Sequence, residues 1–353
     1  MSASLPARVV TAPRPVPRGL WSAEGLEEVE AAMVRLCSGR RLDRLGTILS
    51  DHVSSGGKRL RARLTLACVE ALGVPRADGI SWAAACEMLH NATLIHDDLQ
   101  DGDRVRRGRE ATWVRHGLPQ AINAGDLGLM LPYVAIDDVP RPPAVRWQLA
   151  LALARSAERV VRGQAAELEL PHQKRLGWDS YADAVMGKTA ALFGLPVVGA
   201  ALIAGLSPEE AWGLAEEMMP IGLLFQVQDD ILDLFGDKGR GEIGSDIKEG
   251  KVSALVVEHL RLHPWEEPWL RGVLALPRSE TTEAMVLQVI RRFEEGGALH
   301  AVWRHLADID DAVADAPRLG AHRRLHTVAS ELVARALAPI IHTNPQTSVR
   351  EWA

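Results

Sequence analysis

The stretch EMLHNATLIHDDLQD, residues 87–101, decides how the rest of the chain is interpreted. Its polar side chains recur every three or four residues, so they form one stripe along a helix. The stripe consists of His90, Thr93, Asp97 and Asp101. The positions between them are mostly apolar, which predicts a helix in the protein core. Because unpaired polar groups are costly to bury, the stripe has to face water, a metal ion or a ligand.

A second acidic block, DDILD at residues 229–233, repeats the pattern of DDLQD at residues 97–101. Carboxylates four residues apart repel one another on a helix, so both blocks require compensating positive charge. Mg²⁺ is usually held by one or two carboxylates together with substrate phosphates. Two blocks facing each other across a cavity would therefore hold a diphosphate through shared metal ions. The predicted metal ligands are Asp97, Asp98, Asp101, Asp229, Asp230 and Asp233.

Basic segments lie near the first block. A loop at residues 104–109 follows it, and the segment SSGGKRLR at residues 54–61 opens another helix with cations in its first turn. The helix dipole disfavours cations at that end and favours anions, so this segment predicts anion binding. Arginine also pairs bidentately with phosphate. The alternatives are a solvated basic turn and, for a single acidic block, a solvated helix end with internal salt bridges.

A glycine-rich segment follows the second block. Residues 236–244 contain four glycines. Such a segment suggests a lid that orders over a ligand, and a plain connecting loop is the alternative.

The composition limits the classes of function. Hydrophobic residues make up 47% and charged residues 24% of the 353 residues, which is typical of a globular protein. A net charge of −6 gives no general argument for nucleic-acid binding. The three cysteines, at 37, 68 and 86, form no Cys-x-x-Cys pair. Their number argues against a disulfide framework or a zinc site and favours a reducing, cytoplasmic location.

The chain is predicted to contain one large domain. Long Ala/Leu-rich helical patterns dominate, and no sustained strand alternation occurs. Residues 1–20 are expected to be a disordered tail, because their prolines oppose an amphipathic helix, although a transit peptide is the alternative. Residues 21–340 are predicted to form a single all-α helical bundle around a central cavity. Residues 341–353 are predicted to be a C-terminal tail.

One uncharged run, residues 189–206, is nearly long enough to span a membrane. A helix that is apolar all round is the core helix of a globular protein in most cases. We therefore predict a buried core helix here and no transmembrane segment. Ser207 and Pro208 then form a helix start, and that helix is expected to continue through the second acidic block.

Taken together, the motifs from Gly56 to Lys251 resemble the trans-isoprenyl diphosphate synthases of the polyprenyl synthetase family, most nearly those that make geranylgeranyl diphosphate. The resemblance implies the isoprenoid synthase fold, a homodimer and three Mg²⁺ bound by the two aspartate blocks. It also implies two substrates, isopentenyl diphosphate and an allylic diphosphate. The family's reaction is ionisation of the allylic diphosphate, attack by the double bond of isopentenyl diphosphate, and loss of a proton to the released diphosphate.

The resemblance assigns roles to individual residues. Lys58, Arg61, His90 and Arg107 match the isopentenyl diphosphate site, and Arg106 matches the arginine that holds the allylic diphosphate. Lys188, Thr189, Gln226 and Lys251 match residues lining the diphosphate and the nascent cation, and Gln164 is expected to face the site. The implied catalytic residues are Lys188, Thr189, Gln226 and Arg106.

The chain departs from the family pattern at two positions. Gly241 stands where the family usually has lysine, and Glu167 stands where it has aspartate. Neither departure removes a predicted metal ligand, so the chain is not interpreted as inactive.

Product length is predicted from the residues before the first block. Members with short products carry an aromatic residue four or five positions before the first aspartate, where this chain has the small residues Thr93 and Ala92. Met88 lies about 6 Å further along the helix. These features predict a C20 product, with C25 or longer as the alternative, and Ala92→Phe is expected to shorten it.

Two other functions compete with this interpretation. A class I terpene cyclase would share the scaffold but needs a second motif of Asn/Ser/Glu type and an aromatic cavity. Aromatic residues make up only 5% of this chain, and its second motif is aspartate-rich. A non-catalytic partner subunit is disfavoured because both aspartate blocks are intact.

Overall fold

The computed structural model describes residues 22–39, 43–236 and 243–344. The N-terminal half contains α1 (Leu26–Ser38), α2 (Arg44–Val53), α3 (Leu60–Ala71), α4 (Arg76–Gln100), β1 (Val105–Arg106), β2 (Arg109–Glu110), α5 (Thr112–His116), α6 (Leu118–Asp137), α7 (Pro143–Glu169) and η1 (Leu170–His172). Next come α8 (Trp178–Val185), η2 (Met186–Ala190), α9 (Ala191–Ile203), α10 (Pro208–Met218), α11 (Pro220–Phe235), α12 (Ser245–Lys248) and α13 (Ala254–Leu262). The remaining elements are η3 (Pro264–Glu266), α14 (Glu267–Leu274), α15 (Glu283–Glu295), α16 (Ala298–Ala314), α17 (Pro317–Ala321), α18 (Arg323–Leu337) and η4 (Ala338–Thr343).

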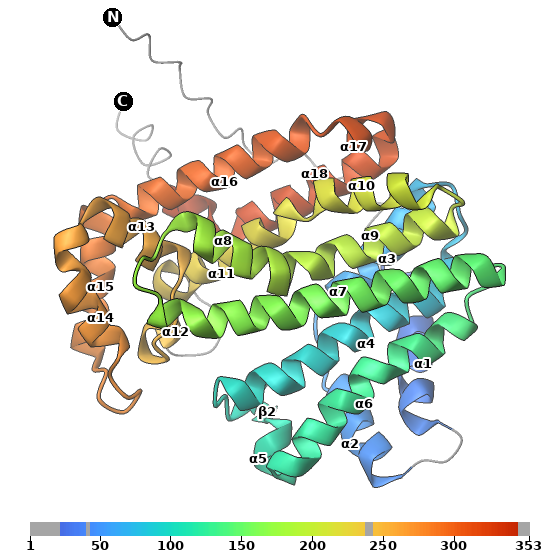
Figure 1. Cartoon of the computed structure of the whole chain (residues 1–353), viewed down its shortest axis with the longest axis horizontal. Helices are drawn as coiled ribbons and strands as arrows, with labels where there is room; N and C mark the ends of the chain where they lie inside the picture. Colours follow the sequence, from blue (N-terminus) through green and yellow to red (C-terminus); the bar gives the residue numbers. More distant parts are fainter. Residues whose placement is uncertain (1–21, 40–42, 237–242, 345–353) are drawn as a thin grey trace, which may run out of the picture.

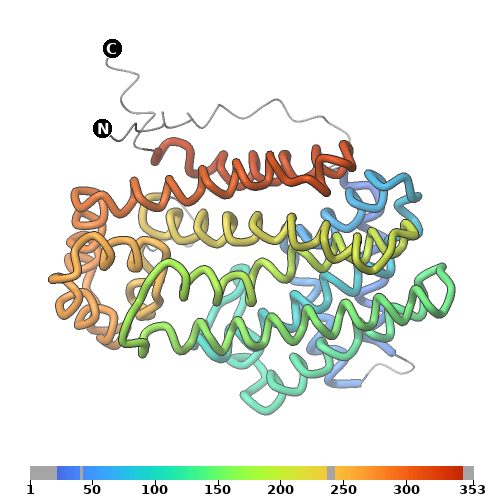
Figure 2. Tube along the Cα trace, turned by 45° about the horizontal axis from the view of Figure 1, so that its top comes forward, coloured from blue at the N-terminus to red at the C-terminus, as the bar shows by residue number. Residues whose placement is uncertain are grey.

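Helix α4 is the central element of the bundle. It packs against α3, α6 and α9, and α7 runs beside α9 (Figure 1). Helices α16 and α18 contact α11 and form a further layer over it (Figure 2). The predicted all-α fold is confirmed, and the strands in the described residues are a single two-residue pair, β1 and β2.

The hydrophobic core divides into two clusters, and α4 contributes to both. The larger cluster joins α3, α4 and α7 to the helices from α8 onward. The smaller one joins α1, α2 and α6 to the opposite side of α4. Helix α4 is therefore covered on both sides over most of its length, and the polar stripe predicted from the sequence lies in its C-terminal half.

Helix α9 is buried at every one of its 13 positions. It lies in the helical run Trp178–Ile203, which is the one run among the described residues that is long and apolar enough to cross a membrane. In this structure 78% of the apolar window is buried inside the protein. The run is therefore packed as the core helix that the sequence predicts.

The expected helix from Pro208 through the second acidic block is divided in two. Ser207 caps α10 as predicted, because its hydroxyl accepts a hydrogen bond from the Glu210 N–H at 3.2 Å. The helix then ends at Met218, and α11 starts at Pro220. Proline lacks the N–H that an α-helix interior requires, so the break occurs at this residue.

Other predicted features are placed as follows. All three cysteines are buried and free, so the prediction of no disulfide is confirmed. The predicted N-terminal tail lies outside the described residues, as do positions 237–242 of the glycine-rich segment and positions 345–353. The start of the predicted C-terminal tail belongs instead to η4.

Candidate active site

The first acidic block lies at the C-terminal end of α4, and its aspartates point in two directions. Asp97 and Asp101 lie beside two lysines from distant segments, Lys188 of η2 and Lys251. Asp98 is fully buried on another side of the helix. Helical spacing thus places Asp97 and Asp101 on a common face and separates Asp98 from them.

Asp97 is largely desolvated. Burial raises the pKa of its carboxyl to about 6, Lys188 opposes the rise, and Asp101 adds to it. The Lys188 Nζ lies 3.9 Å from Asp97 Oδ1 and also donates to Glu167 on α7. Glu167, the residue that departs from the family pattern, thus holds the lysine that faces Asp97.

Asp101 has its own lysine partner. The Lys251 Nζ lies 3.0 Å from Asp101 Oδ2 and 2.9 Å from Glu249 Oε2. Burial alone would lower the pKa of Lys251, but the surrounding carboxylates outweigh burial and raise it. The ammonium is therefore charged and compensates the acidic face of α4.

Arg106 holds the third aspartate of the block. It lies in the β1–β2 hairpin, and its Nε donates to Asp98 Oδ1 at 2.7 Å, while its Nη2 donates to the same oxygen. The other oxygen of Asp98 is buried without a hydrogen-bond partner. This pair fixes the hairpin against α4, so Arg106 is presented at the end of the aspartate face.

The predicted cationic pocket assembles around His90. The Arg61 Nη1 lies 3.2 Å from His90 Nε2, and Arg107 donates to the Ser55 hydroxyl at 3.1 Å. Burial lowers the pKa of His90 well below its usual range, and Arg61 and Arg107 lower it further. The imidazole is therefore neutral, and its Nε2 accepts the hydrogen bond from Arg61.

Glycine and unpaired donors shape the same pocket. Gly57 has φ +125°, and a Cβ there would lie 2.9 Å from the Arg107 guanidinium carbon, so only glycine admits this approach. Lys58 is exposed beside it. The Arg61 Nε and His90 Nδ1 are buried without partners. Unpaired buried donors beside clustered cations suit an anionic ligand.

A π-helical turn presents the next two predicted residues. Lys188 and Thr189 lie in η2, where the helix widens by one residue between α8 and α9. Gly187 of this turn packs on Gly163 of α7, and a Cβ on Gly163 would lie 2.1 Å from the Lys188 backbone nitrogen. The glycine pair lets α7 approach closely enough for Glu167 to reach Lys188.

Gln164, next to that glycine pair, reaches across to α4. Its Nε2 donates to Gln100 Oε1 at 2.8 Å. Gln164 therefore points toward the site, where it contacts Gln100, the residue immediately before Asp101.

The second acidic block is held by hydrogen bonds around Asp230. Its Oδ2 accepts from the Tyr181 hydroxyl and from the Ala254 N–H, both at 2.7 Å, and its Oδ1 accepts from Gln226 at 3.1 Å. Burial raises the pKa of Asp230 to about 6, and these three hydrogen bonds oppose the rise. Gln226 in turn accepts from the Thr189 hydroxyl at 3.2 Å. A continuous chain of contacts thus connects η2 to Asp230.

The other two aspartates of the second block differ in exposure. Asp233 is buried, and it accepts from the Ser245 hydroxyl at 2.6 Å and from the Asp246 N–H at 3.0 Å. It therefore fixes the start of α12, where the glycine-rich segment returns to the fold. Asp229 is exposed.

The model of the polyprenyl synthetase family matches residues 43–292. The chain belongs to the polyprenyl synthetase family. It is a prenyltransferase, an isoprenyl diphosphate synthase, and it has the isoprenoid synthase fold. The matched segment contains both aspartate blocks, the cationic pocket and η2.

Named relatives agree with this assignment. The chain is 35% identical over 260 residues to a short chain isoprenyl diphosphate synthase of Methanothermobacter thermautotrophicus, covering 72% of this chain and 78% of that protein. It is 36% identical over 242 residues to a farnesyl diphosphate synthase of Geobacillus stearothermophilus, covering 65% and 80%. The crystal structure of geranylgeranyl pyrophosphate synthetase from Pyrococcus horikoshii superposes with a TM-score of 0.72 at 26% identity, covering 88% and 99%.

The predicted chain-length residues of this synthase lie on different sides of α4. Thr93 is on the side of Asp97, and its hydroxyl donates to the His90 carbonyl. Ala92 instead packs on α6, where a Cβ added to Gly128 would lie 2.8 Å from its own Cβ. Met88 belongs to the cluster formed with α1, α2 and α6. Thr93 therefore shares the side of Asp97, whereas α6 covers the side that carries Ala92 and Met88.

The donor set of this synthase suits a metal ion that also binds substrate. Among the described residues no group of three His, Cys, Asp or Glu side chains is arranged to hold a metal ion by itself. Mg²⁺ usually takes one or two carboxylates and completes its coordination with water and phosphate oxygens. Asp97 and Asp101 on α4 and Asp229 and Asp230 on α11 are oxygen donors of that kind.

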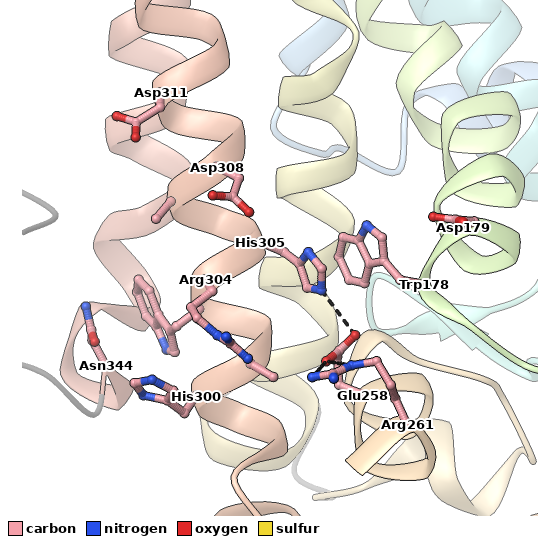
Figure 3. Close-up of a pocket in the computed structure, with 13 residues that line it drawn as sticks. Trp178, Asp179, Glu258, Arg261, His300, Arg304, His305, Asp308, Asp311 and Asn344 are labelled. Atoms are coloured by element: carbon pink, nitrogen blue, oxygen red, sulfur yellow. Dashed lines mark hydrogen bonds and ion pairs between the residues drawn. The ribbon is translucent and has the colours of Figure 1, made fainter. Parts of the chain in front are cut away.

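A separate pocket of about 660 Å³ lies between α8, α13 and α16, and none of the predicted site residues lines it (Figure 3). Within it, the Trp178 and His305 rings stack at 3.5 Å, and His305 Nε2 lies 3.1 Å from the buried Glu258. Tyr181 on α8 and the N–H of Ala254 on α13 are the groups that hold Asp230. The stacked pair therefore braces the two helices behind the second block.

Several contacts of the site escaped the sequence interpretation. The Tyr181 hydroxyl, the Ser245 hydroxyl and the Ala254 N–H carry the second block, and Ser55 carries Arg107. Tyr181 is one of only two tyrosines in the chain, which was the one available signal. A backbone N–H leaves no mark in the sequence at all.

Proposed function

We propose that this synthase is a Mg²⁺-dependent enzyme that condenses isopentenyl diphosphate with an allylic diphosphate and releases a C20 product. The observation that carries the proposal is the pair of lysine–aspartate contacts on α4 beside the cationic pocket around His90. One site offers carboxylates with lysines beside them, and the other offers Lys58, Arg61 and Arg107 beside the neutral His90. Two anion sites of different character fit two diphosphate substrates that require different treatment.

The carboxylate site suits the allylic substrate. Bound Mg²⁺ would supply Lewis-acid stabilisation of the departing diphosphate, with about three ions expected from the family resemblance. Asp97, Asp101 and the second block would hold the ions, while Arg106, Lys188 and Lys251 contribute positive charge toward the same diphosphate. Asp98 keeps Arg106 in place, so its part is to position that arginine.

The cationic pocket suits isopentenyl diphosphate, which has to stay intact. Lys58, Arg61, His90 and Arg107 gather without a carboxylate of the aspartate blocks in contact with them, so the pocket binds a diphosphate and does not promote its loss. The neutral His90 offers its Nδ1 side as a further hydrogen-bond donor when the tautomer places the proton there.

Neutral dipoles face the reacting carbons. The hydroxyl of Thr189 and the amide of Gln226 lie between Lys188 and Asp230, where the allylic cation is expected to form. Ionisation is followed by attack of the double bond of the second substrate, and the proton then passes to the released diphosphate. These reaction steps require no side-chain nucleophile.

The test is a product assay on the whole chain. Incubation with isopentenyl diphosphate, farnesyl diphosphate and Mg²⁺, followed by chromatography of the dephosphorylated products, is expected to give a C20 alcohol. A C25 or longer product supports the longer-chain alternative. A cyclised hydrocarbon supports a terpene cyclase, and no product with any allylic primer supports a non-catalytic partner subunit.

We propose further that two copies of the chain associate. Helices α6 and α7 expose large apolar side chains in the single chain, and those on α6 recur at Ile122, Met130, Tyr133 and Val134. On α7 the exposed large apolar residues are Trp147, Val161 and Leu168. Exposed apolar rows on neighbouring helices are typical of an interface. Sedimentation analysis is expected to give a dimer, and Met130→Asp is expected to shift it toward monomer.

We also infer a reducing, cytoplasmic location for the enzyme. Three buried free thiols support it, because burial of free cysteines without disulfides is typical of such compartments. Fractionation of the cells that produce the protein tests this location.

A further inference from the structure

Below the aspartates, one side of α4 faces α7 and α9. Counting back from Asp97 in steps of three or four residues, this side carries Thr93, Leu89, Cys86 and Trp82. The last three belong to the large buried cluster that also contains α9, whereas Met88 belongs to the other cluster. A prenyl chain that starts at Asp97 and runs along the α4–α9 contact therefore meets these side chains in turn.

Trp82 is the largest of them, and α9 is shaped to receive it. The residue is fully buried, and a Cβ added to Gly199 would lie 1.8 Å from its Nε1. Any other residue at 199 would displace the indole. The same Nε1 has no hydrogen-bond partner, although a buried indole N–H usually finds one. Shape, rather than hydrogen bonding, therefore explains a tryptophan at this position.

The structure is closed immediately beyond Trp82. Arg141, in the turn between α6 and α7, donates to the Ile203 carbonyl at the end of α9 at 2.8 Å. The same guanidinium lies 2.9 Å from Asp78 in the first turn of α4. Arg141 thus ties the ends of α4 and α9 together one turn past the tryptophan. The helices cannot separate there to let a longer chain pass.

The position of Trp82 corresponds to a particular chain length. Fifteen residues separate it from Asp97, which is about 22 Å along the helix axis. Four bonds of about 1.5 Å give an extended isoprene unit of roughly 5 Å, so four units measure roughly 20 Å. A C20 chain would reach the indole, and a fifth unit would collide with it.

We propose that Trp82, seated on Gly199 and backed by Arg141, is the floor that limits the product chain of this enzyme. The inference rests on the proposed function, because it concerns the tail of the product of that reaction. It moves the length-determining contact from Ala92 and Met88 to the side of α4 that faces α9. Leu89 and Cys86, which lie between Asp97 and the indole, are smaller than tryptophan, and the close contact with Gly199 holds the indole in place.

The principal test replaces Trp82 with leucine. In the product assay with farnesyl diphosphate, Trp82→Leu is expected to lengthen the main product by at least one isoprene unit relative to the unsubstituted enzyme. Met88→Leu is the matched control on the opposite side of the same helix, and its product is expected to be unchanged. A folded Trp82→Leu protein with unchanged product length overturns the proposal, as does a longer product from Met88→Leu alone.

A binding measurement separates this inference from the proposed reaction. Geranylgeranyl and farnesylgeranyl diphosphates, which carry C20 and C25 chains, are titrated into the full chain with Mg²⁺ present. The preference for the C20 compound is expected to fall at least tenfold in Trp82→Leu. An unchanged preference overturns the floor, even where the enzyme is active. If the unsubstituted chain forms no product, the proposed reaction fails, and the binding preference still decides the inference.

A milder variant covers the case in which leucine disrupts folding. Trp82→Phe keeps most of the buried volume and loses no hydrogen bond, since the indole N–H has no partner. It is expected to raise the fraction of C25 product severalfold. Thermal unfolding confirms that the variant is folded, and a folded Trp82→Phe protein with no change in product or in binding preference overturns the proposal.

Discussion

The carboxylates of the block on α4 contact cations, whereas Asp230 in the block on α11 is held by neutral donors. Asp97 and Asp101 have lysines beside them, and those lysines come from segments far along the chain. Asp230 instead accepts hydrogen bonds from Tyr181, Gln226 and a backbone N–H. Two blocks with one sequence pattern therefore have different tasks in the fold.

The two blocks differ in whether a ligand can replace the group that now contacts the carboxylate. Lys188 and Lys251 each have a second carboxylate partner, Glu167 and Glu249, so a metal ion that binds the aspartates leaves both lysines paired. A buried carboxylate that accepts from three donors cannot be displaced without leaving those donors unpaired. We infer that the first block adapts to ligands while the Asp230 network provides a fixed frame.

Removing Asp97 from the acidic block on α4 is expected to have the largest effect. Asp97→Ala removes a predicted metal ligand from the charged face of α4 and should lower kcat/KM by about 10³-fold. Initial-rate measurements at saturating Mg²⁺ test this. Asp126→Ala, which removes an exposed aspartate from α6, is the control and should change the rate little. A loss of less than tenfold for Asp97→Ala would remove the basis for its assigned role.

Removing Asp230 from the acidic block on α11 should instead reduce the stability of the fold. Asp230→Ala leaves the buried Tyr181 hydroxyl and Ala254 N–H without their acceptor, at a cost of about 3 kcal/mol in the free energy of unfolding. Urea denaturation in buffer with chelator measures it. Asp97→Ala should cost much less, because Lys188 keeps Glu167 as a partner. Equal losses in the two variants would show that the blocks do not differ in this respect.

The arginines near the first block predict a pH effect. Burial lowers the pKa of His52 to about 3, and Arg107 and Arg106 lower it further. Between pH 7 and 5 the unfolded chain gains a proton at His52 that the folded protein does not, so the free energy of unfolding falls as pH falls. The loss due to this residue is about 2 kcal/mol.

The effect of His52 is measured as a difference between proteins. Urea denaturation at pH 7 and pH 5 should show a smaller pH dependence for His52→Asn than for the unsubstituted chain. His300→Asn, at an exposed position on α16, should leave the pH dependence unchanged. If His52→Asn has the same pH dependence as the unsubstituted chain, His52 is protonated in the folded state.

The smallest predicted effect concerns the hydrogen bond between Tyr181 and Asp230. Tyr181→Phe removes one hydrogen bond to Asp230 and should cost about 1 kcal/mol in the free energy of unfolding. In a chain that already carries Asp230→Ala, the same substitution should cost almost nothing, because the partner is gone. Urea denaturation of the four proteins gives the coupling. Additive costs would mean that the hydroxyl acts through another group.

Helical spacing predicted what lies on one helix and failed where a second helix decides. It placed Asp97 and Asp101 on a common side of α4, and the lysines that meet them were assigned through the family resemblance. It could not show that α6 covers Ala92, because only Gly128 on that distant helix permits the contact. Likewise Tyr181 and Ala254 meet Asp230 across 49 and 24 residues of sequence, a separation that no local pattern reports.

The division of the predicted helix at Pro220 has a different cause. A single residue without an N–H outweighed an apolar pattern that continued on both sides of it. Pro220 is visible in the sequence as a possible helix break, but the helical pattern on both sides of it favoured one continuous helix. Backbone donors such as the Ala254 N–H carry no such signal and need the structure.

The π-helical turn at η2 adds one residue to the path between α8 and α9, and this extra residue sets the phase of everything after it. Deleting one residue from Met186–Ala190 would restore an ordinary helix, and each side chain of α9 would then rotate by about 100° relative to α8. Gly199 would leave Trp82, and an apolar side chain would take its place against the indole. The single turn that contains Lys188 and Thr189 therefore also keeps Gly199 in register with Trp82.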